Sequence, residues 1–232
     1  MPDRIRARLA DAAREHGTLA VARSCAAWGA RYAAGRVRDG GGTFAWGGEP
    51  IPLFHHRYHY TWMNERGVEL ALAQRELGAA TGSVLEVGNV LSHYLDTAHT
   101  VVDLYERGPG VVNEDVVDYD PGRRFDLIVS LSTIEHVGFD EVVLDPEKPE
   151  RAIRALAGLL EPGGRLWVTL PVGYNPSLDE RIRDGRVRFD RVRALRRGRA
   201  GWAEVEVSEV WDAAYDRLLF TATGLLVCAL DR

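Results

Sequence analysis

Two short apolar segments that end in acids carry the residues whose chemistry stands out. Residues 83–90 read Ser-Val-Leu-Glu-Val-Gly-Asn-Val, a strand pattern with Glu86 near its end and Gly88 at the following turn. A glycine at such a turn lets a ligand reach the backbone, because no side chain blocks the approach. The next apolar strand adds Asp103 and Glu106, and an acid there can hold the two hydroxyls of a ribose. Together the segments predict a nucleoside-containing cofactor on a parallel α/β sheet.

Further strand and helix patterns must position these residues. We expect strands over residues 83–88, 99–105, 110–113, 126–131 and 164–170. Apolar residues at helical spacing predict a one-faced helix over 149–160, and a second helix over 68–77 with Asn64 as its cap and Gly78 as its stop. The alternation of strands and helices predicts parallel strands joined by right-handed crossovers. Only residues 92–97 suggest a helix between the first two strands.

The first part of the chain has a different pattern from the rest. We expect residues 1–63 to form a helical and aromatic extension or lid, and residues 64–232 to form the cofactor-binding domain. Residues 3–36 are rich in Ala and Arg at helical spacing, which predicts one or two helices. Glycine-rich residues 39–48 predict a flexible connector whose two aromatic side chains pin it to a surface. Residues 1–50 could also serve as the arm of a homodimer.

The composition argues against several classes of protein. With 232 residues, 46% hydrophobic and 27% charged, the chain suits one large globular domain or one domain with an appendage. Its formal charge of −5 argues against a nucleic-acid partner, and no apolar run approaches the roughly 20 residues that cross a bilayer. Cys25 and Cys228 are expected as free thiols in a reducing cytoplasm. Lys148 is the only lysine, and the arginine bias is typical of GC-rich bacterial genomes.

After Pro171 the pattern changes again. Nine arginines lie within residues 181–199. They could meet an anionic acceptor, but a solvated surface is favoured because neighbouring acids already offset part of the charge. Residues 202–208 and 218–230 read as strands that can pair antiparallel with each other.

The order of these elements resembles the class I S-adenosylmethionine-dependent methyltransferases over about residues 64–232. Five patterns carry the resemblance: Glu86-Val-Gly88, an acid at Asp103 or Glu106, Asn113-Glu-Asp-Val116, Phe125-Asp-Leu-Ile-Val-Ser-Leu-Ser132, and Leu159-Leu-Glu-Pro-Gly-Gly-Arg-Leu-Trp-Val168. Each is weak alone, but five in the right order and spacing are specific. The resemblance implies a Rossmann-like α/β fold with a mostly parallel seven-stranded sheet, an antiparallel C-terminal strand and a helical N-terminal extension.

The resemblance also implies S-adenosyl-L-methionine as the cofactor. Its implied contacts are Glu86, Gly88, Asn89, Ser92, Asp103, Glu106, Asp115, Val116 and Ser130. In the family, the acid that Asp115 matches meets the adenine amino group, and the next residue packs on the ring. The chain departs from the family's Gly-x-Gly-x-Gly turn, because Val90 and Ser92 replace two glycines. Since a β-branched residue disfavours positive φ, either the turn differs in shape or the affinity for the cofactor is reduced.

The segment Ile134-Glu-His-Val137 resembles the Glu-His pair that follows strand four in the ubiquinone-pathway O-methyltransferases. His136 is the first candidate for the general base, because a histidine can take a proton near neutral pH. Glu135 is expected beside it, either binding substrate or holding the loop. The alternative is that His136 only hydrogen-bonds its own loop. A longer metal-binding pattern in a related RNA-modifying branch is not matched, because Ser132 stands at its first position.

Aromatic and polar residues in two segments are candidates for binding the methyl acceptor. They are His55, His56, Tyr58, His59 and Tyr60 in the N-terminal part, and Tyr174 and Asn175 after the fifth strand. The flat rings suit a lid or pocket wall, although packing between the extension and the core is an alternative. The His-His-x-x-His spacing is not that of a zinc motif, so no metal is expected. A turn without a ligand role is the alternative for Tyr174 and Asn175.

These patterns predict an enzyme that transfers a methyl group from S-adenosylmethionine to a small polar acceptor, with a hydroxyl of a sugar or specialised metabolite favoured. One alternative is a methyltransferase-like protein that binds a ligand or partner without catalysis, which the two missing glycines of the turn suggest. A nicotinamide-dependent oxidoreductase is a third reading. It is disfavoured because Gly88-Asn-Val-Leu-Ser-His93 lacks two of the three glycines of that fingerprint.

Overall fold

The protein is built around one eight-stranded sheet. A computed structural model describes residues 10–11, 13–14, 17–37 and 42–232. The strands of the sheet are β3 (Val84–Val87), β4 (Thr100–Val102), β5 (Val111–Val112), β6 (Phe125–Leu131), β7 (Leu160–Pro171), β8 (Arg191–Gly198), β9 (Gly201–Val205) and β12 (Gly224–Asp231). Their order across the sheet is β5-β4-β3-β6-β7-β12-β8-β9.

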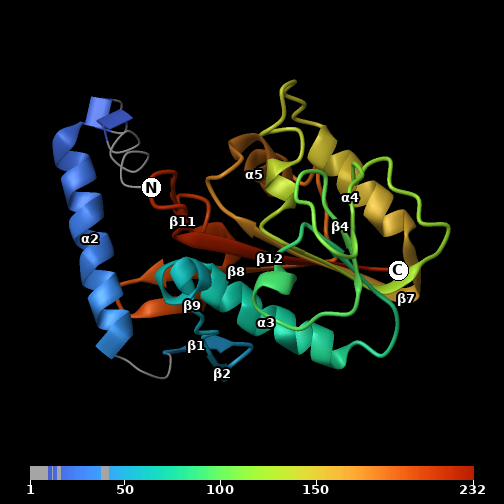
Figure 1. Cartoon of the computed structure of the whole chain (residues 1–232), viewed down its shortest axis with the longest axis horizontal. Helices are drawn as coiled ribbons and strands as arrows, with labels where there is room; N and C mark the ends of the chain where they lie inside the picture. Colours follow the sequence, from blue (N-terminus) through green and yellow to red (C-terminus); the bar gives the residue numbers. More distant parts are fainter. Residues whose placement is uncertain (1–9, 12, 15–16, 38–41) are drawn as a thin grey trace.

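The pairing confirms the predicted mixed α/β sheet. Strands β5, β4, β3, β6 and β7 pair in parallel, and β12 lies antiparallel between β7 and β8. Figure 1 shows β12 crossing the middle of the sheet. The sheet has one strand more than the seven expected, because β9 adds antiparallel to β8. The suggested pairing of residues 202–208 with 218–230 is wrong. Strand β9, from the first range, pairs with β8. Strand β12, from the second range, pairs with the other edge of β8 and with β7.

Helices cover both faces of the sheet (Figure 1). Helix α3 (Arg66–Ala79) covers one face, and α4 (Lys148–Gly158) and α5 (Pro176–Arg183) cover the other. Adjacent residues of β6 serve opposite faces, as strand alternation requires: Ile128 packs in the cluster of α4 and α5, and Val129 in that of α3. The helices predicted over 68–77 and 149–160 are therefore present, each within a few residues.

The connections between the first parallel strands are short. Only the 3-10 turn η2 (Leu91–His93) stands where residues 92–97 suggested a helix. Between β4 and β6 the described chain forms turns and the two-residue strand β5, and after β6 it forms the 3-10 turn η3 (Ile134–His136). Loops rather than long helices therefore surround the carboxyl ends of these strands.

The extension before α3 consists of α2 (Thr18–Val37), the hairpin β1 (Thr43–Trp46) and β2 (Glu49–Pro52), and the 3-10 segment η1 (Tyr58–Met63). The prediction of a flexible connector is wrong for residues 42–48, because the hairpin lies there. Residues 38–41 and parts of the helices expected over 3–36 lie outside the described residues. Gly47 and Gly48 form the turn with φ of +62° and +83°, which glycine adopts without strain.

The hairpin is held to the core by its own side chains. Phe44 and Ile51 are buried in the cluster under α3, and the Arg193 guanidinium stacks 3.7 Å above the Trp46 ring. The pinning expected of Phe44 and Trp46 is confirmed. The short elements η4 (Val207–Glu209), β10 (Tyr215–Asp216) and β11 (Thr221–Ala222) complete the fold. No helix in the described residues is long and apolar enough to cross a membrane.

Most arginines of the 181–199 stretch form ion pairs within the chain. Arg181 pairs with Glu147 and Glu150 at 3.0 Å, and Arg191 pairs with Asp231 at 2.7 Å. Arg193 and Arg196 similarly bind acids on neighbouring strands or turns. These pairs agree with the expectation of a solvated surface.

Candidate functional site

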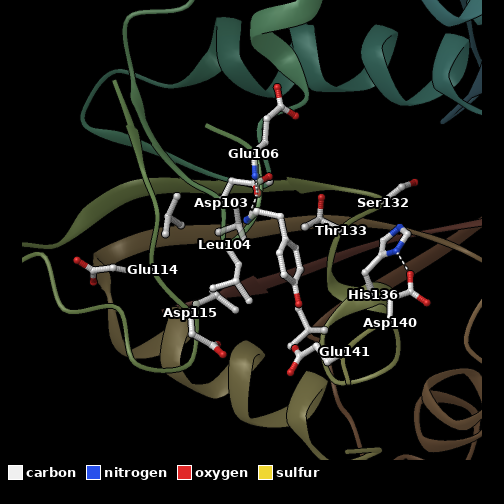
Figure 2. Close-up of a pocket in the computed structure, with 16 residues that line it drawn as sticks. Asp103, Leu104, Glu106, Glu114, Asp115, Ser132, Thr133, His136, Asp140 and Glu141 are labelled. Carbon is white, nitrogen blue, oxygen red and sulfur yellow. Dashed lines mark hydrogen bonds and ion pairs between the residues drawn. The ribbon is translucent and has the colours of Figure 1, made fainter. Parts of the chain in front are cut away.

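A cavity of about 580 Å³ lies at the carboxyl ends of four parallel strands. It is lined by residues that follow β3, β4, β5 and β6, among them Gly88, Asp103, Glu106, Asp115 and His136. Figure 2 shows Asp103, Leu104 and Glu106 on one side and Ser132, Thr133 and His136 on the other. Ligands of open α/β sheets bind in this position. The cavity thus has the position that a cofactor site takes in an open α/β sheet.

Gly88 forms the sharp turn at the end of β3. Its φ of +84° is in the left-handed region, which an L side chain rarely adopts. A Cβ there would lie 2.2 Å from Oγ1 of Thr133. Val90 has a φ of −99°, so the turn needs no glycine at that position. The departure from the family's glycine pattern thus leaves one required glycine, and the turn has a shape of its own.

Glu86 holds this turn from beneath and does not line the cavity. Its Oε1 atom accepts hydrogen bonds from the backbone N–H groups of Val90 and Leu91, at 2.9 and 2.7 Å. Its Oε2 atom lies 2.7 Å from Nε2 of His99. Because the carboxylate is fully buried and engaged by these partners, Glu86 acts on the shape of the loop.

The two acids after β4 are also engaged by the loop. The Asp103 carboxylate accepts hydrogen bonds from the backbone N–H groups of Asn89, Tyr105 and Glu106, at 2.7–2.9 Å. Oε1 of Glu106 accepts from Nδ2 of Asn89 and pairs with Nε2 of His93, both at 2.8 Å. Both acids line the cavity. Glu106 keeps a partly exposed carboxylate there, and Asp103 mainly fixes the loop.

Asn89, Ser92 and Ser130 stand behind the cavity wall and are not among its lining residues. The Ser92 hydroxyl donates to Oδ1 of Asn89 at 2.6 Å. The buried Ser130 hydroxyl donates to the carbonyl oxygen of Val87 at 3.1 Å. All three therefore fix the ends of β3 and β6 in this structure.

Asp115 carries an ion pair with the only lysine of the chain. Nζ of Lys148 lies 2.5 Å from Oδ2 of Asp115 and 2.6 Å from Oε2 of Glu141. Burial alone would raise the pKa of Asp115, but the hydrogen bonds from Lys148 and from the N–H of Val117 outweigh it and lower the pKa. Asp115 is therefore a carboxylate, and with the buried Val116 it borders the cavity.

A second cavity, of about 370 Å³, adjoins the first. It is lined by Trp28, His59, Tyr60, Met63, Asn64, Glu65, Arg66, Ser132, Glu135, His136, Pro171, Tyr215, Leu219, Phe220 and Thr221. Ser132 and His136 line both cavities. These two residues thus form a common wall between an open space at the strand ends and a space under the N-terminal extension.

Backbone strain concentrates around the second cavity. Among the described residues, the non-glycine residues with positive φ are His59 (51°), Tyr60 (46°), Ser132 (44°) and Phe220 (49°). All four line this cavity. Such conformations cost about 1–3 kcal/mol each and cluster where function requires a fixed geometry. The strained non-glycine residues of the described chain thus lie together around the second cavity.

His136 is oriented by two further residues. Its Nδ1 atom lies 2.5 Å from Oδ2 of Asp140 (Figure 2), and the Tyr174 hydroxyl donates to the same oxygen. Burial opposes ionisation of Asp140, but the hydrogen bonds from Tyr174 and His136 lower its pKa. An ionised Asp140 accepts the proton of Nδ1, so Nε2 keeps its lone pair and can accept a proton.

Glu135 belongs to a group of buried charges at the second cavity, of which Glu65, Arg66 and Glu135 line it. Glu65, Glu69 and Glu135 are all buried, and the one guanidinium among them, that of Arg66, binds Glu69 at 3.0 Å. Burial, reinforced by Glu69, raises the pKa of Glu65 to about 7. Burial likewise raises the pKa of Glu135 well above its usual range. The group thus holds more carboxyls than its single cation can neutralise.

The aromatic residues between His55 and Trp62 lie between helix α2 and the rest of the domain. Trp62 stacks on His55 with ring centroids 4.3 Å apart, and Tyr60 packs edge-on against Trp28 of α2. His59 and Tyr60 line the second cavity, whereas His55, His56 and Tyr58 line neither cavity described here. Tyr58 instead stacks on His93 at 5.0 Å. No group of three His, Cys, Asp or Glu residues in the described chain could hold a metal ion.

Tyr174 and Asn175 contact the catalytic candidates and line neither cavity. Nδ2 of Asn175 donates to the carbonyl oxygen of Glu135 at 2.9 Å, and its Oδ1 caps α5 by accepting from the N–H of Leu178. The Tyr174 ring packs 4.4 Å from that of His136. They therefore position the segment after β6.

Sequence reasoning missed several residues of the two cavities. Asp140 follows His136 by four residues, but no helical pattern in the loop indicated that the two side chains meet. Glu65 and Arg66 begin α3, where acids and bases are usually solvated. The signal that could have drawn attention to them is the density of charge, Glu65-Arg66 with Glu69, in a segment that is otherwise apolar.

No family model matches this sequence, and no curated protein was found to match it. Solved structures do match. An S-adenosylmethionine-dependent methyltransferase from Clostridium acetobutylicum is 17% identical, with a TM-score of 0.34 over 47% of this chain and 51% of that one. The N-methyltransferase NodS from Bradyrhizobium japonicum, in complex with S-adenosyl-L-homocysteine, is 17% identical, with a TM-score of 0.43 over 72% and 87% of the two chains.

A third match is the 1,6-didemethyltoxoflavin-N1-methyltransferase of Burkholderia thailandensis, 18% identical with a TM-score of 0.40 over 70% of this chain and 75% of that one. The chain spans about half of the Clostridium protein and most of the other two. At these identities and TM-scores we take neither residue roles nor substrates from these proteins. The α/β fold rests on the strand order and pairing of the chain itself.

Proposed function

We propose that the protein is an S-adenosylmethionine-dependent methyltransferase that acts on a small polar acceptor. The observation that carries this proposal is the common wall of the two cavities, formed by Ser132 and His136. A donor in the first cavity and an acceptor in the second would meet at this wall. Bringing two reactants together in a fixed geometry is the main task of the protein in such a transfer.

The residues of the first cavity fit the proposed cofactor in part. Gly88 brings bare backbone to the cavity, and Val116 supplies an apolar surface for a ring. The partly exposed Glu106 carboxylate suits the ribose hydroxyls, and the ionised Asp115 suits an amino group on a base. Asp103 is occupied by three backbone N–H groups, so its role would be to hold the loop. When bound, S-adenosylmethionine would supply an activated methyl group.

His136 would act as the general base. Its Nδ1–H donates to Asp140, so Nε2 would be available to take the proton that the acceptor loses. The Asp140 carboxylate then stabilises the charged imidazole, and Tyr174 keeps Asp140 in place. Asp140 and Tyr174 are positioning residues in this scheme, because neither touches the reacting atoms.

Finer features belong to the same proposal. Residues 1–63 would close the second cavity as a lid, since Trp28, His59 and Tyr60 line it. The resemblance of Ile134-Glu-His-Val137 to the ubiquinone-pathway O-methyltransferase branch stays a prediction. A hydroxyl of a sugar or specialised metabolite stays the acceptor that the sequence favours. A cytoplasmic location and a homodimer also stay predictions.

Calorimetric titration with S-adenosylhomocysteine tests the proposal. We expect binding with a Kd of about 1–100 μM, and we expect Asp115→Asn to weaken it. Glu180→Gln, an exposed change on α5, is the control and should bind like the parent. Absence of binding at high protein concentration would instead support the second candidate, a non-catalytic protein. The occupied carboxylates of Asp103 and Asp115 favour that candidate.

A further inference from the structure

The Glu135 carboxyl group is buried without a partner. Its exposed fraction is 2%, and neither oxygen has a hydrogen-bond partner among the described residues. Nε2 of His136, at 3.7 Å from Oε1, is beyond hydrogen-bond distance. Buried polar groups are nearly always hydrogen-bonded, and protonation alone would leave this one unsatisfied as well. Its place on the wall of the second cavity indicates that a ligand completes it.

The surrounding charges decide which kind of ligand fits. Glu65 lines the same cavity, and its Oε2 atom accepts a hydrogen bond from the N–H of Ala222. Oε1 of Glu69 accepts hydrogen bonds from Ser132 and Thr169, and its Oε2 forms an ion pair with Arg66. Glu65 and Glu135 therefore line the cavity together with Arg66, whose guanidinium is paired with Glu69. An anionic ligand would be repelled by these carboxyls. A purely apolar ligand would leave them unpaired.

The other walls suit a cation as well. Trp28, Tyr60, Tyr215 and Phe220 bring aromatic rings to the cavity, and the faces of such rings attract ammonium groups. The ring faces and the carboxyls both attract positive charge, so the cavity suits a protonated amine carried by a flat molecule.

We propose that the acceptor carries a protonated amine and that Glu135 binds this group in the second cavity. The inference rests on the function proposed above, because it takes that cavity as the acceptor's place. An ammonium group would donate to the two unpartnered oxygens of Glu135, with Glu65 adding negative charge. This contact makes the acceptor a cationic, amine-bearing small molecule whose methylated atom is another nucleophile, because a protonated amine has no lone pair to attack with.

A matched pair of probes tests the proposal by binding alone. Benzylamine and benzyl alcohol have the same ring and differ in the charged group. We expect the wild-type protein to bind benzylamine at least about tenfold more tightly than the alcohol, by calorimetry or NMR titration. Glu135→Gln keeps the shape but cannot form the carboxylate that an ammonium group would pair with, and it should reduce this preference to about threefold or less. Glu180→Gln should keep the full preference.

A second variant keeps the proposal testable if Glu135→Gln does not fold. Glu65→Gln should lower the affinity for benzylamine less than Glu135→Gln does, because Glu65 already accepts a backbone hydrogen bond. Circular dichroism would check that both variants are folded. Equal binding of amine and alcohol, a preference that survives in Glu135→Gln, or no benzylamine binding up to about 20 mM would overturn the proposal.

Titration of the same samples with S-adenosylhomocysteine separates the two proposals. If the nucleoside binds but the amine preference is missing, the inference about the acceptor is wrong and the methyltransferase proposal stands. If the amine preference is present but S-adenosylhomocysteine does not bind, the methyltransferase proposal is wrong. The second cavity would then be the cation site of a non-catalytic protein.

Discussion

Oδ2 of Asp140 lies 2.5 Å from Nδ1 of His136 and also accepts the Tyr174 hydroxyl. Three side chains from the loop after β6 and the end of β7 therefore form one chain of hydrogen bonds that ends at the wall between the cavities. Such an arrangement fixes both the ring orientation and the tautomer of a histidine. It gives His136 a structural basis for acting as a base, which the sequence motif alone did not supply.

This hydrogen-bond chain predicts a graded series of rate losses. His136→Ala should lower kcat by about 100-fold or more, because the base is lost. Asp140→Asn should lower kcat by about 10–100-fold through a misoriented ring, and Tyr174→Phe by less. The Kd for S-adenosylhomocysteine should stay unchanged in all three. An unchanged kcat in His136→Ala would assign the residue to structure.

The ion pair between Asp115 and Lys148 gives a prediction with an internal control. Asp115→Asn should weaken S-adenosylhomocysteine binding by about 1–3 kcal/mol, because a charged hydrogen bond is lost. Lys148→Met removes the competing cation and should leave the affinity equal or higher. Calorimetry measures both. If both variants weaken binding equally, the pair serves the shape of the loop and Asp115 does not contact the ligand.

The turn at Gly88 should tolerate no side chain. Gly88→Ala forces an alanine to a φ of +84°, which costs about 1–2 kcal/mol, and it places a Cβ against Thr133. Gly78→Ala in α3 is the matched control. Nothing lies within 4 Å of its Cβ position, and we expect a gain of up to about 1 kcal/mol. Urea unfolding measures both, and adding Thr133→Ala should recover part of the Gly88→Ala loss.

The raised pKa of Glu65 predicts that the free energy of unfolding depends on pH. Its pKa of about 7 lies above the ordinary value of 4.5, so the folded state holds this proton more firmly than the unfolded chain. The stability it contributes is complete below pH 4.5 and is lost as the pH rises to about 7. Between pH 4.5 and 8 the wild type should therefore lose about 2–3 kcal/mol relative to Glu65→Gln. Urea unfolding at both pH values checks this, and parallel pH curves for the two proteins would contradict it.

The parts of the fold that the sequence predicted are those with strong local signals. The apolar run of β6 and the Pro-Gly-Gly turn before the body of β7 are readable from a few neighbouring residues. Helix α4 was predicted from its one-faced apolar pattern. The pairing of β12 was not, because its partners lie up to 66 residues away, as in the pair Asp231 and Arg165, and local patterns carry no information about such distances.

The sequence of residues 43–52 contains a hairpin pattern, although a flexible connector was predicted there. Phe44 and Trp46 alternate with small or polar residues, and Gly47-Gly48 is a turn sequence for antiparallel strands. The neighbouring glycines at positions 40–42 favoured a connector instead. Burial of Phe44 under α3 decided the outcome, because a tertiary contact outweighs the local preference for disorder.

For the site, the sequence predicted residue types better than their partners. It placed Gly88, Asp103, Glu106, Asp115 and His136 at one edge of the sheet, and they meet at one cavity. It did not predict that backbone N–H groups occupy the Asp103 carboxylate, or that Lys148 pairs with Asp115. Hydrogen bonds of loops depend on the backbone path, which residue patterns do not specify.

The position of β12 has a consequence for how the chain folds. Both strands that flank it, β7 and β8, leave the ribosome earlier, and each then has an unpaired edge until β12 has been made. Exposed edges of this kind can pair with other molecules. Newly made chains should therefore depend on chaperones, and substitutions that slow the docking of β12 should lower the soluble yield even where they leave the two cavities untouched.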